Sequence, residues 1–468
     1  MSRLSLLLVV CLTILGCPPA DAAEKLTLEE VLNSSLKHFP EIQQVKAKRE
    51  ASEASVQAAL GAFDASLDNN SSARTSGFYD GNQTSTKIVK PFENFNARVS
   101  AGYRISDGDF PIYDDYLFTN SGGEFNLEVF LSLLRDRDIN DDRLALWNSR
   151  LNVEKAKQEE ILAKISTQNA AMKAYYEWLA AAEILHIQEE LLTIAEERQK
   201  GLVIRSNQGD IASITVTENT QYIYRRQGQL NDAKRLLANA SANLALYVRD
   251  DNGNMITPPH SSQVKMPKPE HSSPLSPTKD TSSAYENRPE SSIIEAEIEK
   301  QKNELNAGEN KLLPRADLVV RTARDSGNGS NTRRGLENII GLNISIPLQN
   351  NTAEGSISKA KANLRALDFE RQMLRNKIAQ QLEFIENDIE AAARFIDISG
   401  NEIKVAEKMQ SSERKIFSTG GSDFFVLNMR EEQLANAKIK NVTAQLDYYK
   451  VLANYYAAAV KLDKFYIK

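Results

Sequence analysis

The chain has 468 residues, of which 41% are hydrophobic and 26% are charged, and its formal net charge is -6. This acidic balance excludes a basic nucleic-acid-binding surface, which needs an excess of Lys and Arg. After residue 20, no run approaches the roughly 18 apolar residues that a spanning helix needs, which excludes a polytopic helical membrane protein.

Residues 1–22 have the pattern of a signal peptide. A basic start is followed by an apolar run over 4–15, and this order is typical of an export signal. Two endings fit the residues that come next. Ala20-Asp21-Ala22 matches a simple cleavage site, whereas Ile14-Leu15-Gly16-Cys17 resembles a lipoprotein box in which Cys17 becomes the lipidated first residue.

The stretch 23–260 alternates between helical and strand-like patterns. Thr27 and Glu30 form a capping box at the start of a helix, and Pro40 holds a first-turn position that favours a second helix. At about 63–134 the side chains alternate between polar and apolar, which predicts strands joined by a long polar loop. From 141 to 203 a helical pattern predicts a rod of about 95 Å. A turn near 205–214 and a returning helix are expected to follow.

A Pro- and Ser-rich linker is predicted at 261–288, and the same plan then recurs over 289–468. His38-Phe39-Pro40-Glu41 has its counterpart in Asn287-Arg288-Pro289-Glu290. Strands are expected at about 315–348, and a second rod of about 98 Å over 353–417. A turn near 418–424 precedes a final helix. The chain is therefore predicted to contain two structural repeats.

The second rod carries apolar residues at alternating steps of three and four, with Arg371 and Ser399 as interruptions. This spacing predicts a coiled-coil-like seam against other helices. The seam consists of Ile357, Ala360, Leu364, Leu367, Leu374, Ile378, Ile385, Ala392, Ile396, Ile403 and Ala406.

The ordered, duplicated set of these features resembles the outer membrane efflux protein family, the TolC-like channels of Gram-negative bacteria. The resemblance covers nearly all of the chain after the signal segment. It is carried by Leu26-Thr27-Leu28-Glu29-Glu30-Val31-Leu32, Pro40-Glu41, Arg288-Pro289-Glu290, Leu313-Pro314-Arg315-Ala316-Asp317-Leu318, Ile346-Pro347-Leu348, and the glycine turns at Gly209 and Gly420.

The resemblance implies a mainly α fold with a β membrane part. Long antiparallel rods would form a periplasmic α-barrel, and each protomer of a homotrimer would give four strands to a shared 12-stranded β-barrel in contact with outer-membrane lipid. The implied function is that of a passive exit duct in a tripartite efflux or type I secretion system. Its implied partners are a periplasmic adaptor, also called a membrane fusion protein, and an inner-membrane transporter. The implied location is the outer membrane, with a long periplasmic part.

The two turns between long helices are the candidate functional residues. In a helical tunnel both turns would lie at the periplasmic mouth, where rings of carboxylates select for cations. Asp210 and Asp423 are the candidates for such a ring, unless Asp210 is an ordinary N-cap. Arg205, Arg414 and Lys415 are expected to form gate ion pairs. Gly209, Gly420 and Gly421 are expected to shape the turns and contact an adaptor.

The loop and strand aromatics are candidates for a membrane-interface girdle. Phe110, Tyr113, Tyr116 and Phe118 fit loop packing equally well, whereas Phe125 and Phe130 lie at a strand.

The sequence contains no recognisable catalytic, cofactor or metal motif. The histidines are His38, His186, His260 and His271, without ligand spacing, and both cysteines lie in the signal segment. The chain is therefore expected to be neither an enzyme nor a metalloprotein. Two alternatives to the channel remain open, a periplasmic adaptor and a secreted coiled-coil structural protein.

Overall fold

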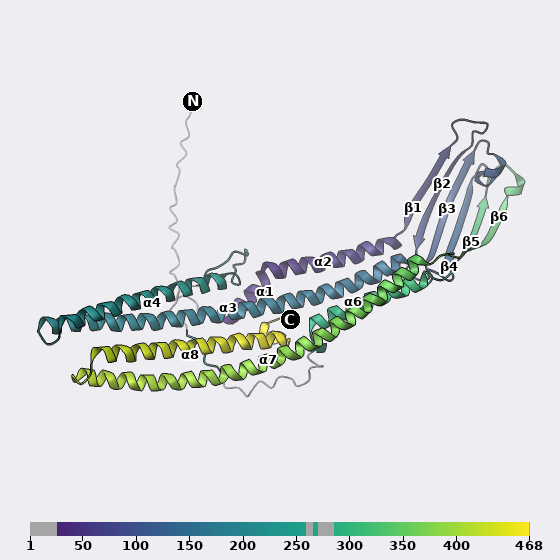
Figure 1. Cartoon of the computed structure of the whole chain (residues 1–468). Helices are drawn as coiled ribbons and strands as arrows, with labels where there is room; N and C mark the ends of the chain where they lie inside the picture. Colours follow the sequence, from purple (N-terminus) through teal and green to yellow (C-terminus); the bar gives the residue numbers. More distant parts are fainter. Residues whose placement is uncertain (1–25, 259–264, 270–284, 468) are drawn as a thin grey trace, which may run out of the picture.

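The computed structural model describes residues 26–258, 265–269 and 285–467. The predicted signal segment with Cys17, and most of the predicted linker 261–288, lie outside these residues. The molecule is elongated, with a β-sheet at one end and the tips of two helical hairpins at the other (Figure 1). Among the described residues, no helix combines the length and apolar character needed to cross a membrane.

Two helices lead into the sheet from the N-terminal side. α1 (Leu28–His38) begins at the predicted capping box, in which the Glu30 carboxylate accepts from Thr27 N–H at 2.8 Å and Thr27 Oγ1 accepts from Glu30 N–H at 3.3 Å. α2 (Pro40–Leu60) has Pro40 in its first turn. Both predicted starts are confirmed. A short 3₁₀ turn, η1 (Gly61–Phe63), then connects α2 to the first strand.

The sheet has six antiparallel strands whose order in the sheet is their order in the chain. The strands are β1 (Ser66–Ala73), β2 (Asn82–Pro91), β3 (Ala97–Asp107), β4 (Glu124–Ser132), β5 (Arg315–Asp325) and β6 (Gly335–Ser345). The 3₁₀ turns η2 (Ile112–Leu117) and η3 (Asn331–Arg333) lie in the connections.

Six strands are two more than the four that the family resemblance implied. The difference lies in the first half of the chain, which supplies β1 to β4 where the second supplies only β5 and β6. β2 was hard to see because its sequence NQTSTKIVKP is polar on both faces. Its threonines and the pair Ile88 and Val89 still favour extended backbone, since β-branched side chains pack well on a pleated surface.

The register separates the sheet into an apolar face and a polar face. Leu127 of β4 pairs with Ala101 of β3, and Val129 pairs with Val320 of β5, which in turn pairs with Ile340 of β6. These side chains share the apolar face. Members of the polar face include Arg104, Ser106, Glu124, Ser132, Asp317 and Arg321, as the two-residue period requires.

Charged groups on the polar face pair with one another across the strands. Glu124 accepts from Arg104 Nη2 at 2.8 Å and also from Arg321, and Asp317 accepts from Ser132 Oγ at 2.9 Å. Glu124 and Asp317 are buried, whereas Ile340 on the apolar face is 77% exposed. The apolar face is therefore the one that lacks a covering in a single chain.

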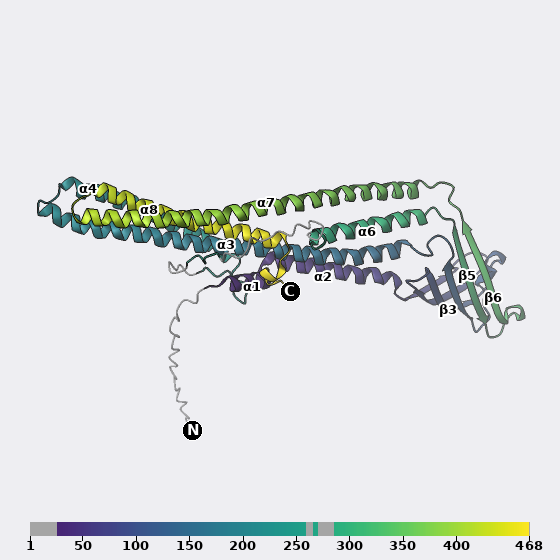
Figure 2. The ribbon, with the colours of Figure 1, turned by 90° about the horizontal axis from the view of Figure 1, so that it is seen from below.

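Four long helices build the rest of the molecule. α3 (Asp141–Asn207) and α4 (Ser213–Ala245) form one hairpin, and α7 (Asn351–Ser418) and α8 (Phe424–Ala458) form the other. α6 (Pro289–Asn310) runs between α3 and α7, and η4 (Leu462–Phe465) follows α8 near the C-terminus. The two predicted rods are confirmed. Both views show α7 along one edge of the molecule (Figure 2).

The main core lies where α1, α4 and α8 pack on α3. Trp178 of α3 is 1% exposed, and it lies in one apolar cluster with Leu32 of α1, Leu244 of α4 and Ala453 of α8. The predicted seam of α7 is also confirmed, since each of its residues is buried or half-buried. Packing on neighbouring helices thus explains how helices of this length are stabilised.

Candidate functional site

Both hairpin tips close with the same backbone motif. At the end of α3, Gly209 N–H donates to Ser206 C=O at 3.1 Å and Asp210 N–H donates to Arg205 C=O at 2.9 Å. At the end of α7, Gly420 N–H donates to Phe417 C=O at 3.1 Å and Gly421 N–H to Ile416 C=O at 3.0 Å. This is the Schellman pattern, which satisfies the last free carbonyls of a helix.

The positive φ predicted for Gly209 and Gly420 is found at both turns. Gly209 and Gly420 have φ of 83° and 79°, a left-handed conformation that other L-residues adopt only with strain. Gly421 does not have a positive φ. A Cβ at Gly421 would lie 3.2 Å from Ile416 Cγ2, so close approach of the chain to the end of α7 explains the small residue there.

The predicted charged residues lie at the tips, but the described chain does not pair them. Asp210, Arg205, Arg414 and Lys415 are at or beside the two turns, and within the described residues none of them makes an ion pair with another. Asp423 caps α8, with its carboxylate accepting from Phe425 N–H at 3.1 Å. Asp210 is not the N-cap of α4, because Ala212 holds that position.

A buried ionic cluster lies further along the hairpins and joins them. Arg198 of α3, Arg226 of α4, and Asn428 and Glu431 of α8 form it. Glu431 accepts from Arg198 and, at 3.3 Å, from Arg226 Nη2. The Asn428 amide oxygen accepts from Arg198 at 2.7 Å and from Arg226 at 3.2 Å. The other terminal nitrogen of Arg226 donates to Leu191 C=O at 2.9 Å. We call this group the α8 clasp.

The α8 clasp is desolvated and carries one positive charge more than it carries negative. Arg226 is 2% exposed and Glu431 is 4% exposed. Burial lowers the pKa of Arg226, and Glu431 opposes this shift by favouring the charged guanidinium. A single carboxylate therefore compensates two guanidinium groups, and its loss would leave two like charges buried side by side.

Aromatic side chains cover the clasp on the side of the tips. The Arg198 guanidinium lies 5.6 Å from the centroid of the buried Phe424 ring, and Tyr222 meets that ring edge-on at 6.0 Å. A second ion pair joins α4 to α8 beside the clasp. Arg225, the residue before Arg226, contacts Glu432, the residue after Glu431, at 2.6 Å. Because this pair is partly exposed, water screens it far more than the clasp.

The clasp can hold the tip of one hairpin against the other. Arg198 comes ten residues before the α3 C-cap Gln208, so the clasp lies about 15 Å from that tip. Sequence reasoning missed it because its four residues come from three helices. The one available signal was that the residues three and four positions from Arg198 are apolar or small, which places this arginine on a buried side of its helix; they are Ile194, Ala195, Gly201 and Leu202.

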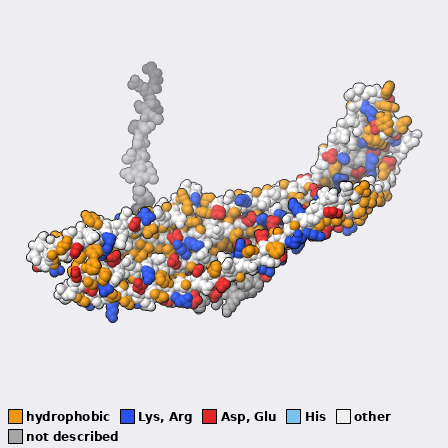
Figure 3. All heavy atoms as spheres, in the orientation of Figure 1, with side chains coloured by type: hydrophobic (Ala, Val, Ile, Leu, Met, Phe, Trp, Pro, Cys, Tyr) orange, Lys and Arg blue, Asp and Glu red, His pale blue; other side chains and the backbone are white. Residues whose placement is uncertain are grey.

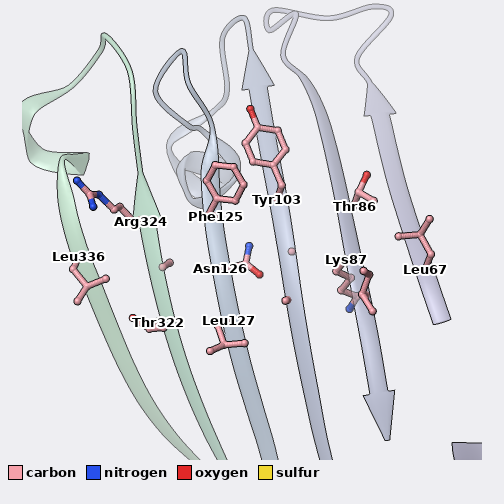
Figure 4. Close-up of a pocket in the computed structure, with 14 residues that line it drawn as sticks. Leu67, Thr86, Lys87, Tyr103, Phe125, Asn126, Leu127, Thr322, Arg324 and Leu336 are labelled. Atoms are coloured by element: carbon pink, nitrogen blue, oxygen red, sulfur yellow. The ribbon is translucent and has the colours of Figure 1, made fainter. Parts of the chain in front are cut away.

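The apolar face of the sheet is hollowed. A hollow of about 520 Å³ crosses all six strands there, and Figure 4 shows Tyr103 and Phe125 side by side within it. Their ring centroids are 4.7 Å apart. Phe125 therefore lies on the apolar face, as a girdle residue would. Phe130 lies on the polar face under Arg98, 4.6 Å from its guanidinium, so it is a poor girdle candidate.

The remaining aromatic candidates lie in the β3–β4 connection. Phe110 and Phe118 pack edge-to-face at 6.2 Å, whereas Tyr113 and Tyr116 are 77% and 66% exposed. No group of three or more metal-binding side chains occurs in the parts of the chain that the structure describes.

The chain shares its fold with several solved outer-membrane channels. VceC of Vibrio cholerae matches with a TM-score of 0.65 and 14% identity, over 92% of this chain and 95% of that one. CmeC of Campylobacter jejuni matches with 0.64 and 14%, over 92% and 85%, and the channel OprN with 0.63 and 14%, over 92% and 89%. No family model matches the sequence, and no curated protein matches it. The TolC-like fold that the sequence predicted is therefore confirmed.

Proposed function

We propose that this chain is a passive exit channel in the outer membrane of a Gram-negative bacterium. Three copies would join their sheets into one closed sheet across the membrane and their helices into a periplasmic tunnel. The observation that carries the proposal is a channel-like fold over 92% of the chain, combined with a sheet that leaves a whole apolar face uncovered. No catalytic step is needed for this function.

The apolar face of the sheet supports contact with lipid. Leu127, Leu342 and Ile344 are 43%, 57% and 63% exposed. In a channel formed by strands, side chains alternate between lipid and a polar lumen. The polar face of this sheet, with Arg104 and Arg321 around Glu124, has the composition of a lumen wall. Figure 3 shows hydrophobic side chains gathered over the sheet and near the hairpin tips.

A second apolar stripe on α7 supports association with another copy. It lies on a different side of α7 from the buried seam, and its members are 38% to 68% exposed. Successive members of the stripe are 3, 4, 7 or 11 residues apart. These spacings are close to whole numbers of helical turns, so the members lie on one side of the helix. The stripe consists of Phe369, Met373, Phe384, Phe395, Ile398, Val405, Met409 and Ile416.

The other flank of the molecule offers a matching surface. Exposed apolar side chains along α3 and α4 include Ile204, Ile214, Tyr224 and Leu236. If α7 of one copy packs on α3 and α4 of the next, the contact is head-to-tail and generates a ring when the rotation closes. The sheet edges β1 and β6 also lie on opposite sides of the sheet. Three copies are proposed on the strength of the fold.

The mouth of the tunnel is proposed to be gated at two levels. At the tips, Asp210 and Asp423 of three copies would ring the aperture and favour cations. Arg205, Arg414 and Lys415 make no ion pair within one described chain, so any pairing of these residues at the gate would join neighbouring copies. About 15 Å above the tips, the α8 clasp would hold α8 against α3 and α4 in the closed mouth.

A periplasmic adaptor and an inner-membrane transporter are proposed as the partners. The tips around Gly209, Gly420 and Gly421 expose backbone and small side chains at the far end of the molecule, where an adaptor could bind. Binding there would open the mouth by drawing α7 and α8 away from α3 and α4.

Membrane fractionation with native mass measurement and planar-bilayer recording tests the proposal. We expect a heat-modifiable trimer in the outer-membrane fraction that gives low, cation-selective conductance. A water-soluble protein without conductance would refute the channel and favour the adaptor or the structural alternative.

A further inference from the structure

One insertion distinguishes the first half of the sheet from the second. β5 and β6 are joined by residues 326–334, whereas β1 and β4 are separated by 74–123, which contain β2, β3 and the β3–β4 connection. This connection, residues 108–123, includes η2. We call residues 109–120 the crossing segment.

The crossing segment lies over the polar face of the sheet. Arg104, which projects from that face, donates to Tyr116 C=O at 2.7 Å. Thr119 N–H donates to Ser106 Oγ at 2.6 Å, and Asn120 N–H donates to the Asp325 carboxylate at 3.1 Å. Ser106 and Asp325 belong to the polar face by their register.

Ion pairs fasten the same segment to both sides of the sheet. Asp114 pairs with Arg74, which directly follows β1, and Asp115 accepts from Arg333 of η3 at 2.6 Å. Arg333 also donates to Phe118 C=O at 3.2 Å. Anchors therefore reach from the end of β1 to the connection before β6, so the segment spans the width of the sheet at the end remote from the helices (Figure 1).

The middle of the segment projects away from the sheet. Ile112 is 94% exposed and Tyr113 is 77% exposed, whereas Thr119 and Asn120 at the end of the same segment are buried. Large exposed side chains on a well-anchored segment are suited to line or narrow a passage.

The extra strands also determine the width of the opening. Each edge of the described sheet is an unpaired strand, β1 or β6. Pairing β1 of one copy with β6 of the next removes both edges. Three six-stranded sheets give eighteen strands, and a closed sheet of that size has a radius of about 18 Å, against about 12 Å for twelve strands.

We infer that the crossing segment is a constriction inside this wide closed sheet, at the outer end of the channel. The inference rests on the proposed trimeric channel. The same insertion that widens the sheet by two strands per copy also supplies the segment that narrows it. Because Asp114 and Asp115 are paired with arginines, the side chains available to passing cargo are chiefly Ile112, Tyr113 and Tyr116.

Cross-linking tests where the segment lies. Tyr113→Cys introduces a thiol into a chain whose two natural cysteines lie in the predicted signal segment. If the crossing segments of three copies point to the three-fold axis, their thiols at position 113 lie close enough to be joined by a bis-maleimide that spans about 18 Å. Thiols on the wall of the closed eighteen-stranded sheet would be about 31 Å apart and could not be joined. Phe78→Cys is the matched control, because Phe78 is fully exposed in the β1–β2 connection. We expect covalent dimers from Tyr113→Cys only, because each copy carries a single thiol and one reagent molecule joins two of them.

Conductance tests whether the segment narrows the channel. A Gly-Ser-Gly linker in place of 111–117 shortens the loop and removes Ile112, Tyr113 and Tyr116. In the Glu431→Gln background, which is expected to open the mouth, we expect at least about a twofold rise in conductance.

Trimers that give no Tyr113→Cys cross-links would overturn the inference, as would an opened mouth whose conductance the shortened loop leaves unchanged. If Glu431→Gln does not open the mouth, the cross-linking result decides alone. A protein that is neither trimeric nor conducting would instead refute the proposed function.

Discussion

Replacing Glu431 by Gln should loosen the mouth of the proposed channel. Gln keeps the shape of the side chain and removes its charge. The substitution leaves Arg198 and Arg226 facing each other without a carboxylate, and both are largely shielded from water. In an open mouth these guanidinium groups would reach solvent, so the substitution penalises the closed arrangement selectively.

The size of this effect follows from the burial of the clasp. Two unit charges about 4 Å apart interact by about 4 kcal/mol at an effective dielectric constant of 20. Removing one partner of a buried pair costs about 3–5 kcal/mol because the other charge stays buried and unpaired. A loss of about 3 kcal/mol from the closed state alone would shift the closed-to-open ratio by about 100-fold.

Single-channel open fraction and amide hydrogen exchange measure the shift. We expect Glu431→Gln to raise the open fraction and to lose protection at the first two turns of α8. Glu432→Gln is the matched control, because Glu432 is the next residue and also pairs with an arginine of α4. Its partner Arg225 is 48% exposed, so this pair contributes only about 0–1 kcal/mol. Equal effects of the two substitutions would refute the role of the buried clasp.

Three further predictions concern the tips, the sheet and the α7 stripe. Asp210→Asn and Asp423→Asn should raise resting conductance and reduce cation preference because they remove the proposed carboxylate ring; bilayer recordings in which both variants match the parent would contradict it. Leu342→Arg should cost about 2–4 kcal/mol of stability in the membrane, whereas Asn343→Arg on the opposite face should cost little, as read from heat-modifiability of the folded protein in detergent. Ile398→Asp places a charge in the exposed stripe, and it should weaken the trimer at least tenfold in native mass titrations. Ala393→Asp should not weaken it, because Ala393 lies about 140° round α7 from Ile398.

The sequence was sufficient for the helical part of the fold because helical periodicity is strong in long segments. The α7 seam follows a spacing of three and four that only a helix places on one side, and each of its residues is at least half-buried. Gly209 and Gly420 were recognisable because a positive φ after a long helix nearly demands glycine.

The sequence was insufficient where a feature depends on several elements at once. β2 has too few apolar residues to show a period of two, so its place in the sheet depends on β1 and β3 beside it. The α8 clasp joins three helices, and nothing in the local sequence of Arg226 indicates that Glu431 lies 3.3 Å away. The second stripe of α7 is hard to recognise in the sequence because all its members except Met373 directly follow a charged residue and because they are spaced up to 11 residues apart.

The two proposed narrow points, the mouth held by the α8 clasp and the crossing segment, lie in series along the channel. Resistances in series add, so the tighter point dominates the conductance and masks changes at the other. With the mouth closed, altering Tyr113 or its neighbours should change conductance little. With the clasp loosened, the crossing segment becomes the larger resistance and its effect should emerge. The proposed channel would therefore control passage at the helical end and limit the size of its cargo at the strand end, where six strands per copy would otherwise leave a wide opening.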